Sequence, residues 1–91
     1  MASFNLTPKA SADIDRIYDF GIDRFGLTQA NQYLDALEQR FNEIAETPLL
    51  YPAVDHIRAG HRRSVCGVHT IYYRVNTKGV EIIRVIGQQD F

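Results

Sequence analysis

The fold of this chain is decided by the stretch VHTIYYRVNTKGVEIIRVI, residues 68–86. It contains two runs of β-branched and aromatic side chains, which are typical of β-strands, at residues 68–75 and 80–86. The short link between them ends in Gly79, a residue suited to the positive φ of a hairpin turn. We therefore predict an antiparallel hairpin in which Val75 lies opposite Val80.

The pairing of Val75 with Val80 assigns the side chains of this hairpin to two faces, because side chains alternate along a strand. One face collects Ile71, Tyr73, Val75, Val80, Ile82 and Ile86, with His69 and Arg84 at one end. The other collects Val68, Thr70, Tyr72, Ile83 and Val85, with Arg74 opposite Glu81. We expect helices to cover the first face. The second is also half apolar, and no third layer remains in the sequence to cover it, which indicates a partner surface.

The first half of the chain carries the helical pattern that such a face needs. Apolar residues recur at steps of three and four from Ala10 to Phe25, and again from Ala30 to Ala45. Two antiparallel helices are therefore predicted over residues 8–46. We interpret the acids of the first helix as its solvated face: Asp13, Asp15, Asp19 and Asp23.

Capping residues set the ends of these elements. Thr7 is a candidate N-cap with Pro8 at the first helical position, and Gly26 suits the end of the first helix. Thr28 is the candidate N-cap of the second helix, and Pro48 marks its end. Two further strands complete the prediction, at Ser3–Leu6 and Arg62–Cys66.

Length and composition limit the class of protein. The 91 residues suit one domain, 1–91, and the 45% hydrophobic and 23% charged residues indicate an ordinary folded globule. The single cysteine, Cys66, excludes an internal disulfide and suits the reducing cytosol. No apolar run approaches the ~18 residues of a membrane span, and the N-terminus lacks the pattern of a signal peptide. We expect a cytoplasmic protein without a membrane partner.

The net charge of −1 conceals two halves of opposite charge. Residues 1–55 carry four basic and nine acidic side chains, whereas residues 56–86 carry six basic and one acidic. The basic second half favours an anionic partner, although the two halves could instead pair with each other inside the fold. The run Arg58–Arg63, with Arg74 and Arg84, suits phosphate or carboxylate, and hence RNA or an acidic protein segment. Cross-strand ion pairing is the alternative.

No pattern in the sequence predicts a catalytic, metal or cofactor site. His56, His61 and His69 are too scattered for a recognisable metal site. We expect Cys66 to be a buried thiol, with His69 three residues further on and on the opposite face. A glycine-rich phosphate loop and a nucleophile–histidine–acid arrangement are not visible.

Six short motifs, in order, carry a resemblance to a known family. They read LTxxAxxDIxxIY from Leu6, FGxxQAxxYL from Phe25, AxxP from Ala45, IRAGHRR from Ile57, VHTIYYRV from Val68 and VEIIRVI from Val80. Together they resemble the ParE toxins of the ParE/RelE superfamily of type II toxin–antitoxin systems. The resemblance implies an α+β fold with an N-terminal strand and an α-helical hairpin packed on one face of a mostly antiparallel sheet.

The resemblance also implies a function by binding. A ParE-like toxin would inhibit DNA gyrase and so block replication, would be neutralised by a ParD-type antitoxin in a hetero-oligomer, and would need neither a cofactor nor direct contact with nucleic acid. The candidate residues for binding antitoxin or target are Arg58, His61, Arg62, Arg63, Thr70, Tyr72, Arg74, Ile83, Arg84 and Val85. The segment associated with toxicity is Gln88, Gln89, Asp90 and Phe91, where many relatives carry a histidine and a longer tail.

Two alternatives stay open. A RelE-like ribosome-dependent mRNA endonuclease would use Arg62, Arg63 and Arg84 to stabilise charge, and His61 or His69 to move a proton. RelE-type enzymes carry a lysine-rich site, however, and this chain has only two lysines. A degenerate homologue that binds antitoxin without being toxic is the other alternative.

Overall fold

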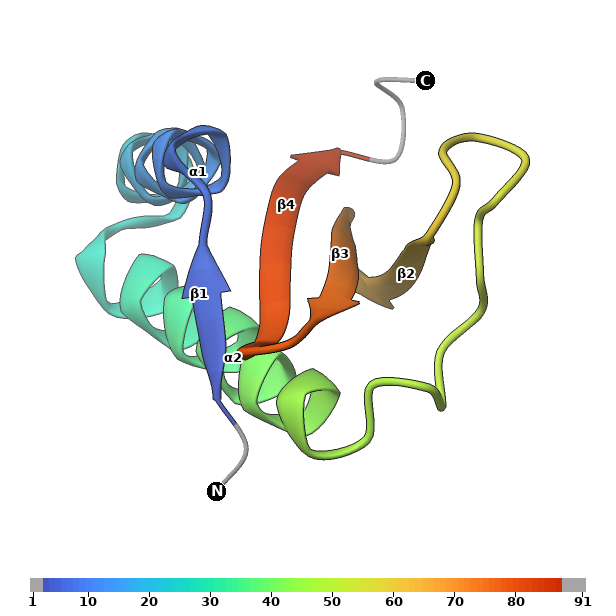
Figure 1. Cartoon of the computed structure of the whole chain (residues 1–91). Helices are drawn as coiled ribbons and strands as arrows, with labels where there is room; N and C mark the ends of the chain where they lie inside the picture. The colour runs from blue at the N-terminus through green and yellow to red at the C-terminus, as the bar shows by residue number, and fades with distance from the viewer. Residues whose placement is uncertain (1–2, 88–91) are drawn as a thin grey trace.

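The computed structural model describes residues 3–87. In chain order the elements are β1 (Phe4–Leu6), α1 (Pro8–Phe25), α2 (Leu27–Glu46), β2 (His61–Cys66), β3 (His69–Asn76) and β4 (Gly79–Gly87). The α+β class, the N-terminal strand and the helical hairpin are thus as predicted (Figure 1). Neither helix in this part of the chain is long and apolar enough to cross a membrane.

The four strands form one sheet in the order β1-β4-β3-β2. Strand β1 runs parallel to β4, and the other neighbours are antiparallel, so the sheet is mostly antiparallel as predicted. Figure 1 shows the strands side by side in this order, with the connection from α2 to β2 running round the β2 edge. Ala53 of this connection pairs with Arg62, so the connection shields part of that edge.

Both helices share one core with one face of the sheet, here called the helix side, and α1 also contacts β4 through Asp13 beyond the end of β1. The core contains residues from α1, α2, β2, β3 and β4, among them Ala10, Leu37, Phe41, Ile44, Cys66, Ile71, Tyr73, Val80, Ile82 and Val85. Tyr73 is fully buried, and its hydroxyl donates a hydrogen bond to the carbonyl oxygen of Pro48 just after α2. Burial raises the pKa of Tyr73 to about 12.

The helix ends follow the predicted caps with one exception. The Thr7 hydroxyl accepts a hydrogen bond from the Ala10 N–H at 3.1 Å, and Gly26, with φ at 91°, ends α1. The carbonyl oxygen of Gly26 then accepts the Ala30 N–H at 3.0 Å, so the same residue begins α2. The prediction that Thr28 caps the second helix is therefore wrong, because Thr28 already lies inside its first turn.

One extra residue in β4 interrupts the predicted register. Pairing follows the prediction from the turn as far as Ile82, but Tyr72 lies opposite Arg84, which leaves Ile83 as a bulge. Thr7 contacts the backbone here twice. Its N–H donates to the carbonyl oxygen of Ile82 at 3.0 Å, and its hydroxyl donates to that of Ile83 at 2.9 Å.

The bulge reverses the predicted faces for the end of β4, because a shift of one residue moves every later side chain to the other side of the sheet. Val85 is therefore in the core, 1% exposed, and not on the open face. Arg84 and Ile86 lie instead on the open face, across from Tyr72 and Thr70.

The open face is partly covered, which corrects the expectation that nothing in the chain could cover it. Val54 of the connection is buried and lines the same hollow as Tyr72, which is only 7% exposed. Thr70 on the same face is also buried.

Candidate functional site

A hollow of about 270 Å³ remains on the open face of the sheet. Its lining residues come from α1, the connection and strands β2–β4: Lys9, Val54, Ile57, Arg58, His61, Tyr72, Ile83, Arg84 and Ile86. Three of these side chains are cationic and none is a carboxylate. We call this the basic hollow, in which apolar side chains are surrounded by Lys9, Arg58 and Arg84.

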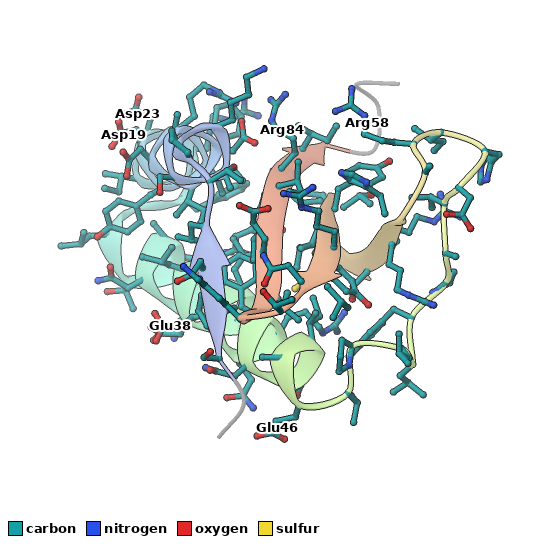
Figure 2. All side chains as sticks on the ribbon, viewed as in Figure 1. Asp19, Asp23, Glu38, Glu46, Arg58 and Arg84 are labelled. Atoms are coloured by element: carbon teal, nitrogen blue, oxygen red, sulfur yellow. The ribbon has the colours of Figure 1, made fainter. Side chains whose placement is uncertain are left out.

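The charge asymmetry of the sequence becomes a spatial separation. Figure 2 shows Arg58 and Arg84 at the same end of the molecule, and the labelled acids on the two helices, at Asp19, Asp23, Glu38 and Glu46. Within residues 3–87, the one ion pair between the acidic first half and the basic second half joins Asp13 to Arg84. The two halves therefore neutralise each other at this one contact, while Lys9 and Arg58 of the hollow form no ion pair among residues 3–87.

The Asp13–Arg84 ion pair connects α1 to β4 beside the hollow. The Arg84 guanidinium donates through Nε to Oδ2 at 2.7 Å and through Nη2 to Oδ1 at 3.0 Å. The Val85 N–H donates to Oδ2 at 3.0 Å, and Arg16 also donates to Oδ1. Asp13 is 1% exposed and the Arg84 side chain 37% exposed, so one end of the pair is buried and the other reaches solvent.

These contacts hold both side chains in their charged forms. Burial raises the pKa of Asp13, but the hydrogen bonds from Arg84, the Val85 N–H and Arg16 outweigh it, so the pKa lies below its ordinary value of 3.8. The hydrogen bond to Asp13 in turn raises the pKa of Arg84.

The prediction that Asp13 belongs to a solvated helix face is wrong. Asp13 follows Ala10 by three residues and precedes Ile17 by four, which places it within the apolar stripe of α1. That spacing is the signal by which the sequence could have indicated a buried carboxylate. The remaining acids of the helix are exposed as predicted: Asp15, Asp19 and Asp23.

Three of the predicted arginines lie outside the basic hollow. Arg62 faces the helix side of the sheet, and its Nη1 donates to the carbonyl oxygen of Tyr51 at 2.7 Å, which fastens the connection to β2. Arg74 forms the cross-strand ion pair with Glu81 at 2.7 Å. Arg63 is exposed on the open face.

The basic hollow thus joins only part of the predicted site. Of the candidates, it contains Arg58, His61, Tyr72, Ile83 and Arg84. Thr70 and Val85 are buried, and the bulge is the reason that Val85 does not reach the open face. The sequence prediction missed Lys9, Val54, Ile57 and Ile86. The segment Gln88, Gln89, Asp90 and Phe91 lies outside the described residues.

A second polar cluster lies at the turn between β2 and β3, on the helix side. The Tyr33 hydroxyl lies 2.6 Å from Nδ1 of His69 and donates to the carbonyl oxygen of Cys66 at 3.1 Å. Cys66 is buried as predicted, and this burial raises the pKa of its thiol. Cys66 and His69 are direct cross-strand partners, so the expectation that they lie on opposite faces is wrong. Among residues 3–87, no three His, Cys, Asp or Glu side chains gather at a metal site.

Solved structures of toxin–antitoxin systems share this fold. A chain of the chromosomal ParDE system from P. aeruginosa superposes with a TM-score of 0.83 at 22% sequence identity, covering 96% of both chains. A chain of the RelBE2 toxin–antitoxin complex from Mycobacterium tuberculosis gives 0.71 at 18% identity, covering 96% of this chain and 98% of the other. The chain therefore shares the small α+β class of fold seen in these two toxin–antitoxin structures.

Sequence comparison identifies the family within that class. The family described as ParE toxin of type II toxin-antitoxin system, parDE, matches residues 4–90. Toxin ParE1 of Mycobacterium tuberculosis is 39% identical over 85 residues, 92% of this chain and 87% of the relative. Toxin ParE1 of Caulobacter vibrioides is 39% identical over 88 residues, 97% and 91% of the two chains. The chain belongs to the ParE toxin family of type II toxin–antitoxin systems.

Proposed function

We propose that this ParE-family toxin acts in the cytoplasm by binding DNA gyrase, so that replication is blocked, and that a ParD-type antitoxin neutralises it by direct binding. Family membership supports the toxin role, and the similarity to a ParDE system supports an antitoxin partner. The basic hollow is the observation that carries the proposal of action by contact. It is an open surface with apolar and cationic side chains held on a sheet.

The residues named for the endonuclease alternative lie on both faces of the sheet. The endonuclease alternative needs Arg62, Arg63 and Arg84 near a proton-transferring histidine. Arg62 and His69 face the helix side of the sheet, whereas His61, Arg63 and Arg84 lie on the open face. The full set therefore does not form one site, and of the two histidines only His61 lies on the same face as Arg63 and Arg84.

The proposed contact surface keeps the predicted residues that line the hollow, with Arg63 beside them. It leaves out Thr70 and Val85, which are buried away from the hollow, Arg62, which faces the helix side, and Arg74, which pairs with Glu81. It comprises Arg58, His61, Arg63, Tyr72, Ile83 and Arg84, together with Lys9, Ile57 and Ile86 of the basic hollow. A partner that covers this surface would bury apolar side chains and meet cations, which favours an acidic, amphipathic segment of the antitoxin.

A supercoiling assay with purified gyrase tests the proposed target. We expect the chain to inhibit supercoiling in proportion to its concentration, and a matched sample mixed first with the protein encoded by the adjacent reading frame to leave gyrase active. Unchanged supercoiling at a large molar excess of the chain would overturn the proposal. Transcript integrity after induction in cells is the second measurement: cleaved mRNA would instead support the RelE-like activity, and normal growth would support a non-toxic homologue.

A further inference from the structure

The Arg84 guanidinium is bound along only one of its edges. A guanidinium carries five N–H donors. Asp13 takes the Nε–H and one N–H of Nη2, so the Nη1 group and one N–H of Nη2 are left for other acceptors. No acceptor for Nη1 is found among residues 3–87. The unused edge belongs to a side chain that lines the basic hollow.

Asp13 is itself held firmly. Its carboxylate is 1% exposed and receives the Val85 N–H as well as both arginines, so it is tied to the backbone of β4 and to its own helix. Arg84 therefore has little rotamer freedom to lose when it binds a ligand. Because Arg16 and Arg84 share one carboxylate, the cluster keeps a net positive charge.

The surroundings of Arg84 define the ligand chemistry. Lys9 and Arg58 supply two more cations, and Ile57 and Ile86 supply apolar contact. The carboxylate of Glu81, on the same strand, is already paired with Arg74. Carboxylates next to an apolar side chain complement this surface, and a fork of N–H donors matches a carboxylate.

We infer that Asp13 is a positioning residue, which holds Arg84 so that its unused guanidinium edge receives a carboxylate of an acidic peptide segment whose apolar side chain enters the basic hollow. The inference rests on the proposed function, and it deepens that function by naming the chemistry of the partner and the residue that prepares the site. Asp13 acts through Arg84 and does not touch the ligand.

Binding of defined peptides to the full chain tests the ligand chemistry. The probe is a hexapeptide of alternating glutamate and leucine, acetylated and amidated at its ends, and the comparison peptide has glutamine in place of glutamate. We expect the glutamate peptide to bind at least about tenfold more tightly, and Arg84→Lys to remove most of that difference. Arg74→Lys, a matched change outside the hollow, should alter binding by less than about twofold. Equal binding of the two peptides, or tighter binding of oligouridylate, would overturn the inference.

A double-mutant cycle tests whether Asp13 acts through Arg84. We expect Asp13→Asn to weaken binding of the glutamate peptide by about fivefold to tenfold in the wild-type background, and by less than about twofold when Arg84→Lys is already present. A merely structural role would weaken binding by the same factor in both backgrounds, and that result would refute the positioning role. Unchanged binding by the single variant would also refute it.

Nitrogen-15 NMR of the wild-type chain gives a readout that does not depend on the folding of any variant. We expect the Arg84 Nε–H resonance to be protected from exchange and to stay in place during the titration, while the Nη resonances shift. A large shift of Nε–H would show that the ligand displaces Asp13, contrary to the inference. None of these measurements contains gyrase. A negative result would therefore not contradict the proposed gyrase target, and a negative supercoiling assay would not contradict the inferred ligand chemistry.

Discussion

Replacing Asp13 by asparagine removes one charge from the contact between α1 and β4 while keeping the shape of the side chain. If the amide oxygen takes the place of Oδ2, it keeps the hydrogen bonds from the Val85 N–H and the Arg84 Nε. The amide nitrogen then faces two donors, the Nη2 of Arg84 and that of Arg16. An amide nitrogen cannot accept, so both of these charge-assisted hydrogen bonds are lost and N–H donors face one another.

The size of the effect follows from how buried each partner is. Breaking a fully buried ion pair costs about 3–5 kcal/mol, and a hydrogen bond to a charged group contributes about 1.5–3 kcal/mol. Asp13 is buried, but the Arg84 side chain is 37% exposed and the Arg16 side chain 66% exposed, so solvent replaces part of the loss. We expect Asp13→Asn to lower the free energy of unfolding by about 2–3 kcal/mol, which lowers Tm by roughly 10–20 °C in a domain of this size.

The loss of folding free energy caused by Asp13→Asn should become smaller as the pH falls. The pKa of Asp13 is lowered on folding, so its carboxylate stabilises the protein above the unfolded value of 3.8, and this stabilisation disappears as the pH falls through the folded value. Urea unfolding from about pH 7 to about pH 3 measures this, with Asp15→Asn as the control on the exposed face of the same helix. The difference between wild type and Asp13→Asn should be largest near neutral pH and shrink below about pH 4. Equal midpoints for the Asp13 and Asp15 variants at neutral pH would refute the reasoning.

Three further predictions follow from single contacts. Thr7→Ala removes both the α1 cap and a hydrogen bond to the β4 bulge. We expect the free energy of unfolding, measured by chemical denaturation, to fall by about 1–2 kcal/mol, against less than about 0.5 kcal/mol for Thr28→Ala. Gly67 has a φ of +60°, and a Cβ at this position would lie 2.7 Å from the Tyr33 hydroxyl oxygen. Gly67→Ala should therefore lower Tm by roughly 8–16 °C in a thermal melt, and an unchanged Tm would contradict the close contact. The pKa of Tyr73 is raised to about 12, so its stabilising effect is complete below pH 10 and is lost as the pH rises through 12. Burial also raises the pKa of Tyr33 and Tyr72, so absorbance titration near pH 11 should show fewer ionised tyrosines in the folded chain than in the unfolded chain, and equal titration would contradict this.

The helices and strands were predictable from the sequence because their signals are local. Thr7 and Pro8 begin α1, Gly26 ends it, and the turn at Gly79 fixes the pairing of Val75 with Val80. Each signal involves residues a few positions apart, whose backbone preferences act whatever the rest of the chain does. The one cap that was wrongly placed, Thr28, lies two residues after Gly26, the residue that does begin the helix.

Only part of the candidate site was predictable, because a shift of one residue in the pairing of β3 with β4 decides which side chains reach the open face. The basic run near Arg58 and the open sheet face were visible in the sequence, but the faces of Arg84 and Val85 depend on the bulge at Ile83. Alternation along a strand indicates faces only while the pairing is regular. Lys9 and Ile57 joined the site through folding alone, since one lies on α1 and the other on the connection.

The amino-acid sequence by itself determined the class of fold, the family and the positive charge of the second half of the chain. The tertiary structure alone decided where that charge is presented. Thr7 binds the backbone of β4 at a separation of 76 residues, and Asp13 binds Arg84 and Val85 at separations of 71 and 72. Contacts of this range become favourable only when helix and sheet are packed together, because packing removes water from the carboxylate and the backbone groups that it pairs with. The bulge, the buried acid and the orientation of Arg84 are therefore properties of the packed protein.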